Sequence, residues 1–309
     1  MYQAKRISHS EFVPIRHQNY HVRVWGKPVP GVAPLVLVHG WMDVAASYQF
    51  LVDALSDSFV SQRHIIAPDW RGYGLSTGSP VDNYWNPDYV ADLDFLIDHY
   101  SPDQSVDLVG HSMGGSVVMQ YGAVRPARIR RLINLEGFGG PVRRATSAPK
   151  HMAAWLDDLK AMSRGDIKLK TYATVTEVAK RLMKTNPRLA RDQAGHDRAE
   201  WLACHWAAET KDGQWEILGD PAHKISGPLL TRLEELLAMY AAITAPTLVV
   251  VASDDSLTGW FGGKFTQAEF DERLKSVPNL QRGRIEDAGH MLHHDQPEQL
   301  ARMIEDFVV

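Results

Sequence analysis

Residues 108–118, LVGHSMGGSVV, contain the turn on which the fold prediction for this chain rests. They join an apolar run typical of a strand (SVDLVG, 105–110) to a helix-type run that Pro126 ends. The turn between them, GHSMG, fits the pattern G-x-S-x-G. A strand that passes through a tight turn into a helix exposes the serine hydroxyl, and the small residues Gly110 and Gly114 relieve the crowding there. Ser112 is therefore a candidate nucleophile.

Composition and charge exclude several classes of protein. A chain of 309 residues, 44% of them hydrophobic, is long enough for one large α/β domain with an insertion. The net charge of −4, without runs of like charge, argues against a nucleic-acid partner. No apolar stretch reaches the ~18 residues that cross a bilayer, and no signal peptide is recognisable. We expect a cytoplasmic protein without a membrane partner, and a buried Cys204 that forms no intramolecular disulfide.

Short apolar runs alternate with helix-type segments along most of the chain. The runs typical of strands buried on both faces lie at 34–40, 64–70, 105–110, 129–137 and 245–253. Their alternation with helices predicts an α/β fold with a mostly parallel central β-sheet and helices on both faces.

The interval 138–242 interrupts this alternation. It has helical stretches, several Trp and His residues, and no comparable apolar run. Because long connections without secondary structure are rare, we interpret it as a helical cap domain inserted between two strands. The predicted domains are thus a core made of residues 1–137 and 243–309, and a cap made of residues 138–242.

A serine needs a general base to act as a nucleophile, and the base needs an orienting acid. The candidate base is His290, in the loop between the last predicted strand and the last predicted helix. Asp254 and Asp255 end the strand 245–253, and Glu136 ends the strand before the insertion. The chain order serine, acid, histidine holds for all three carboxylates, so the residues leave the acid open. The neighbouring His293 and His294 are interpreted as packing or solvent-facing groups.

A tetrahedral oxyanion needs two hydrogen-bond donors. The strand that ends at His39-Gly40 turns so that the Trp41 N–H can face the serine, and the Met113 N–H lies at the start of the following helix. These two backbone groups are the predicted oxyanion hole.

Five segments now resemble the α/β-hydrolase fold superfamily, in the order typical of that family. They are VLVHGWMD, APDWRGYGLS, GHSMGG, APTLVVVASDD and DAGHMLHHDQPEQLA. The resemblance implies Ser112 as nucleophile, His290 as base and Asp255 as acid, with the insertion in the place of the family's cap domain. Some haloalkane dehalogenases of the superfamily take the acid from the position that Glu136 resembles. Serine at the turn, where dehalogenases and epoxide hydrolases have aspartate, argues against both of those activities.

The predicted reaction is hydrolysis of a carboxylic ester of a small, apolar substrate through an acyl-enzyme on Ser112. It requires no metal and no cofactor, and its only predicted partner is the small-molecule substrate; no oligomeric state is predicted. Lactonase, amidase, thioesterase, carbon–carbon bond hydrolase and cofactor-free perhydrolase activities use the same residue types and stay open. A non-catalytic, ligand-binding protein of this fold is a further alternative.

Overall fold

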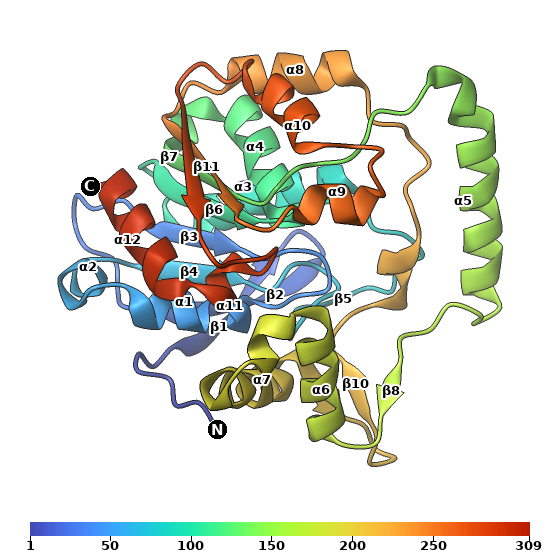
Figure 1. Cartoon of the computed structure of the whole chain (residues 1–309), viewed down its shortest axis with the longest axis horizontal. Coiled ribbons are helices and arrows are strands. Elements are labelled where there is room, and N and C mark those ends of the chain that lie inside the picture. Colours follow the sequence, from blue (N-terminus) through green and yellow to red (C-terminus); the bar gives the residue numbers. More distant parts are fainter.

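A computed structural model describes all residues, 1–309, and is built around one large twisted sheet (Figure 1). Along the sheet the strands follow the order β1-β2-β4-β3-β6-β7-β11-β12, and β5 pairs with β2. From β4 to β12 every pairing is parallel, whereas β2 is antiparallel to β1, β4 and β5. The strands are β1 (His9–Ile15), β2 (Gln18–Trp25), β3 (Leu35–Val38), β4 (Ile65–Pro68), β5 (Thr77–Gly78), β6 (Val106–His111), β7 (Ile129–Leu135), β11 (Thr247–Ala252) and β12 (Leu280–Ile285).

Helices cover both faces of this sheet (Figure 1). Each face has its own hydrophobic core, because β3, β4 and β6 are buried on both sides and direct side chains into both cores. One face carries α3 (Asn86–Tyr100), α4 (Met113–Val124), α8 (Leu233–Ala242) and α10 (Gln267–Leu274). The other carries α1 (Gln49–Ala54), α2 (Asp57–Ser61), α11 (Leu292–Asp295) and α12 (Pro297–Val308). The predicted fold class, a mostly parallel sheet between two helical layers, is confirmed.

Most of the chain between β7 and β11 lies outside the sheet and the helices that cover it (Figure 1). Its elements are α5 (Ala148–Ser163), β8 (Thr171–Tyr172), α6 (Val175–Thr185), α7 (Gln193–Trp206), β9 (Ala207–Glu209) and β10 (Trp215–Ile217). The three strands form a separate antiparallel sheet, so the insertion is not purely helical. We call residues 138–230 the cap segment. It shares a third hydrophobic cluster with Val44, Ala46 and Phe50 of the core.

Three details differ from the sequence-based expectations. Helix α8, placed in the cap by the predicted boundary, packs against α4, and its Tyr240 belongs to the main core. Cys204, expected to be buried, is exposed, because it lies on the outer side of α7 while Leu202, Ala203 and Trp206 face inward. The short strands β8–β10 were also missed, since runs of two or three residues carry no periodicity. No helix is both long and apolar enough to cross a bilayer.

A buried ionic cluster fastens α3 to the sheet. The Asp92 carboxylate is fully buried and accepts hydrogen bonds from the Arg71 guanidinium at 2.5 and 2.6 Å and from Arg16 at 3.1 Å. The Tyr20 hydroxyl donates to the same carboxylate at 2.5 Å. Arg71 is itself buried, so the Asp92 carboxylate is needed to compensate its positive charge.

The substitution Asp92→Ala leaves the Arg71 charge buried without its main partner. We expect the free energy of unfolding to fall by about 3–5 kcal/mol in urea titrations. The matched control on the same helix is Asp98→Ala, which removes a carboxylate that is 65% exposed and contacts Arg128; its expected cost is below about 1 kcal/mol. Equal losses for the two variants would contradict this account of the cluster.

Candidate active site

The turn at Ser112 has the strained geometry that the motif predicts. Ser112 links β6 to α4 with φ 53° and ψ −114°, a conformation that residues with a side chain rarely adopt. A Cβ on Gly110 would lie 2.3 Å from the Gly114 carbonyl oxygen, and a Cβ on Gly114 would lie 2.4 Å from the Val38 oxygen. The strand and the helix approach so closely that only glycine fits at these two positions.

His290 pairs with Glu136. The Nδ1 atom of His290 lies 3.2 Å from Oε2 of Glu136, whose side chain is almost fully buried. The other carboxylate oxygen, Oε1, accepts a hydrogen bond from the Ala252 N–H at 2.7 Å, and the Glu136 N–H donates to the Val250 oxygen at 3.0 Å. Glu136 has φ 54°, the same strained region as Ser112. The carboxylate is thus held between the ends of β7 and β11 and presented to the imidazole.

Asp255, the acid implied by the family resemblance, does not reach His290 in this structure. Its carboxylate caps helix α9 (Ser256–Phe261) by accepting a hydrogen bond from the Thr258 N–H at 2.9 Å, and it is exposed. Hydrogen bonding to the side chain of Thr258, and to its backbone N–H, lowers the pKa of Asp255. Asp254 binds Arg188 of the cap segment at 2.6 Å. The strand β11 therefore ends with two surface carboxylates, and the expected Asp255–His290 pair is replaced by a Glu136–His290 pair.

Ser112, His290 and Glu136 line one cavity. This core-side cavity has a volume of about 390 Å³ and is bounded further by Phe138, Tyr240 and Trp260, among others. A second cavity of about 390 Å³, the cap-side cavity, lies between the core and the cap segment. Ser112 and His290 line both cavities. The serine thus lies where two separate spaces meet.

The two expected oxyanion donors lie beside the serine. Trp41 lines both cavities, Met113 lines the core-side one, and the Trp41 N–H has no hydrogen-bond partner within the protein. The Met113 N–H is in the first turn of α4, where helical N–H groups lack intrahelical acceptors. Trp70 fixes the turn before Trp41, because its backbone and indole N–H groups both bond to His39 at 2.9 Å.

Comparison with known proteins decides the family. The family model of the alpha/beta hydrolase fold matches residues 33–297. The chain belongs to the alpha/beta hydrolase fold family. It is 24% identical over 304 residues to a "Serine hydrolase-like protein" of Danio rerio, covering 97% of this chain and 88% of that protein. It is also 24% identical over 279 residues to "Esterase YbfF" of Escherichia coli strain K12, covering 89% of this chain and 93% of that protein.

Solved structures agree on the fold. The thioesterase domain from the curacin biosynthetic pathway superimposes with a TM-score of 0.78 at 21% identity, covering 97% of this chain and 99% of that domain. The family resemblance seen in the sequence is therefore confirmed, and the interval 138–242 begins after β7 of the hydrolase core.

Three residues near His290 were not identified from the sequence. The exposed Trp260 of α9 stacks obliquely over His290, with ring centroids 4.3 Å apart. His111 bonds through Nε2 to the His290 carbonyl oxygen at 2.7 Å, which fixes the backbone of the base. His293, expected on the surface or in local packing, is fully buried together with His294. Of these three residues, only His111 lies within a motif that the sequence shows, since it stands between Gly110 and Ser112 in the pattern G-x-S-x-G.

The side chains best placed to hold a metal ion are Asp43, His111 and His293, a buried group adjoining the site. They do not include Ser112, Glu136 or His290.

The pairing of Glu136 with His290 makes a direct prediction for serine reactivity. A Glu136→Gln variant keeps the shape but loses the charge that stabilises the imidazolium, so we expect the rate of fluorophosphonate labelling at Ser112 to fall on the order of 10²–10⁴-fold. Asp255→Asn, the matched carboxylate-to-amide change, is expected to label within about twofold of the unmodified protein, since Asp255 only caps a helix. A large loss in Asp255→Asn with none in Glu136→Gln would reverse the assignment.

Proposed function

We propose that this protein is a serine hydrolase that cleaves carboxylic esters through an acyl-enzyme on Ser112, with His290 as general base and Glu136 as the orienting acid. The single observation that carries the proposal is the buried Glu136 carboxylate 3.2 Å from His290 Nδ1, in the cavity that Ser112 also lines. A carboxylate, an imidazole and a serine on a strained turn are the groups that acyl transfer requires.

Each group has one step in the proposed reaction. Glu136 accepts the Nδ1–H of His290, so the Nε2 lone pair is available to take the Ser112 proton. The Ser112 oxygen attacks the ester carbonyl, and the Trp41 and Met113 N–H groups stabilise the oxyanion. His290 then gives its proton to the departing alcohol. A water molecule, deprotonated by His290, hydrolyses the acyl-enzyme and restores Ser112. No step requires a metal or a cofactor.

The names of relatives support an ester substrate in this scheme. One of the matched relatives is named an esterase and another a serine hydrolase-like protein. A matched relative named "2-hydroxy-6-oxo-2,4-heptadienoate hydrolase", 33% identical over 109 residues, keeps carbon–carbon bond hydrolysis as the principal alternative.

A series of p-nitrophenyl esters of increasing acyl length tests the proposed activity. We expect the turnover rate of Ser112→Ala to be lower than that of the unmodified protein by a factor on the order of 10⁴ or more. The matched control is Ser116→Ala, since Ser116 lines the same cavity one helical turn further along α4; it is expected to keep activity within about threefold. Turnover that survives in Ser112→Ala, or its absence from the unmodified protein together with failure of fluorophosphonate labelling, would refute the proposal.

The charged side chains of the cap-side cavity indicate which chemical group the substrate carries on the arm that lies there. Most of the lining is apolar, but Lys170, Arg181 and Lys224 also line it. None of the three forms an ion pair; the Lys224 ammonium donates to the Lys168 carbonyl oxygen, and the Lys170 ammonium lies over the Tyr172 ring. The only carboxylate on this lining is Asp43, and burial raises its pKa to about 7. The core-side cavity has no cationic side chain. We therefore propose that the preferred ester has an apolar arm in the core-side cavity and an arm ending in an anionic group in the cap-side cavity.

Matched pairs of esters test the anionic arm. The mono-p-nitrophenyl esters of pentanoic acid and of glutaric acid differ only by a terminal methyl or carboxylate, and 3-methylphenyl and 3-carboxyphenyl butyrate place the same change on the leaving group. For one of the two pairs we expect a higher kcat/KM for the ester that carries the carboxylate. The ratio of the two kcat/KM values is expected to fall about fivefold to tenfold in Arg181→Ala. Lys184→Ala, on the same helix but outside the cavity lining, is the control. Hydrolysis of all four esters without a carboxylate preference would refute this arm and leave the hydrolase proposal standing.

A further inference from the structure

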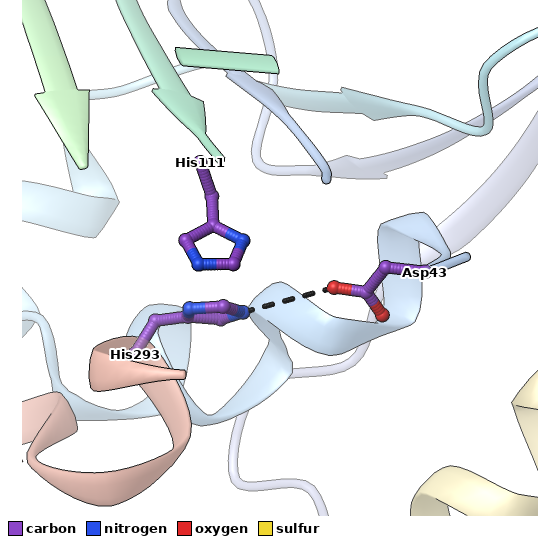
Figure 2. A group of neighbouring side chains, drawn as sticks. All are labelled: Asp43, His111 and His293. Atoms are coloured by element: carbon purple, nitrogen blue, oxygen red, sulfur yellow. Dashed lines mark ion pairs between the residues drawn. The ribbon is translucent and has the colours of Figure 1, made fainter. Parts of the chain in front are cut away.

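Beside the catalytic groups lies a buried cluster that the proposed reaction does not use. It consists of Asp43, in the loop before the 3-10 helix η1 (Ala45–Tyr48), His111, at the end of β6, and His293, in α11 (Figure 2). All three are buried, and each offers one ligand atom within 4.8 Å of the other two. His293 Nε2 lies 3.9 Å from Asp43 Oδ2, and the two imidazole rings are 4.5 Å apart.

Three polar atoms of this cluster have no partner within the protein. They are Oδ2 of Asp43 and the Nδ1 atoms of His111 and His293, all inaccessible to solvent. A buried acceptor without a hydrogen bond costs free energy, so native structures satisfy such atoms with a water molecule or an ion. The cluster therefore has unused acceptors that face a common space (Figure 2).

Two of the three side chains, His111 and Asp43, are held in the way that metal ligands are held, and Nε2 of His293 lies 3.3 Å from the Ser47 hydroxyl oxygen. The Nε2–H of His111 donates to the His290 carbonyl oxygen at 2.7 Å, which leaves a lone pair on Nδ1. The Oδ1 atom of Asp43 accepts the Val44 N–H at 2.9 Å, which leaves Oδ2 available. A histidine ligand that donates its second N–H to a backbone carbonyl, and a carboxylate ligand with a hydrogen bond of its own, are common features of protein metal sites.

The protonation state of the two histidines suits a cation, whereas burial raises the pKa of Asp43 to about 7, so a bound cation would displace a proton from that carboxyl. Burial and the neighbouring histidines hold the pKa of His111 and of His293 well below the ordinary value, so both imidazoles are neutral at neutral pH. Neutral imidazole is the form that binds metal. Asp43 and His111 line the cap-side cavity, which provides a path to the cluster.

We propose that Asp43, His111 and His293 bind one divalent transition-metal ion of the zinc class, and that binding inhibits the enzyme. Two imidazoles and one carboxylate suit Zn²⁺, with the fourth position facing the cap-side cavity. Metal–ligand bonds of about 2.0–2.2 Å require the three side chains to move closer together. Because His111 also holds the carbonyl of His290, that movement displaces the base.

Equilibrium dialysis of the whole chain against Zn²⁺ tests the site without reference to activity. We expect one Zn²⁺ per chain, a rise in Tm with Zn²⁺, and a loss of affinity of about tenfold or more in both Asp43→Asn and His293→Gln. The control is His99→Ala, an exposed histidine on α3, which keeps the affinity. Circular dichroism of each variant shows whether it is folded, and the two cluster variants act as independent tests.

Three results would overturn the proposal. They are no Zn²⁺ bound by the unmodified chain, affinity unchanged in both cluster variants, and affinity lost in His99→Ala alone. A high-resolution structure from crystals soaked in Zn²⁺ that shows a water molecule in the cluster would assign the unused acceptors to that water instead. If Zn²⁺ inhibits Asp43→Asn as strongly as the unmodified protein, the inhibition does not arise from this cluster.

Discussion

The turn at Ser112 is the constraint on which the rest of the site depends. It can exist only where β6 and α4 touch at backbone distance, and the contacts of Gly110 and Gly114 show how little room there is. A side chain at either position would push the helix away from the sheet. The Met113 N–H would then leave its place beside the serine, and the Ser112 hydroxyl would move relative to His290. The strain at one residue is thus maintained by the packing of two whole layers.

Much of this arrangement is predictable from the sequence because it is local. The strand, the glycines and the helix around Ser112 are adjacent in the chain, and buried parallel strands are apolar enough to recognise singly. His290 follows from its place before the last helix. The two proposed oxyanion donors follow from the chain turn at Gly40 and from the start of α4. Each of these predictions required only a few neighbouring residues and a known rule for the end of a parallel strand.

The carboxylate that faces His290 could not be predicted in the same way. Asp255 and Glu136 both follow buried strands, and β7 and β11 are neighbours in the sheet, so their ends point to the same edge. What separates them is tertiary: Glu136 is directed inward by a residue with positive φ and anchored by Ala252, whereas Asp255 turns outward to cap α9. The lining of the cap-side cavity could not be predicted either, because it brings together residues that are far apart in the chain.

The most direct test of the account is a crystal structure of the protein after reaction with a fluorophosphonate. The account predicts phosphorus bonded to the Ser112 oxygen, a phosphoryl oxygen within hydrogen-bond distance of the Trp41 and Met113 N–H groups, and His290 Nδ1 on Glu136. Phosphorus on another residue, or an adducted Ser112 with His290 turned to Asp255, would contradict it.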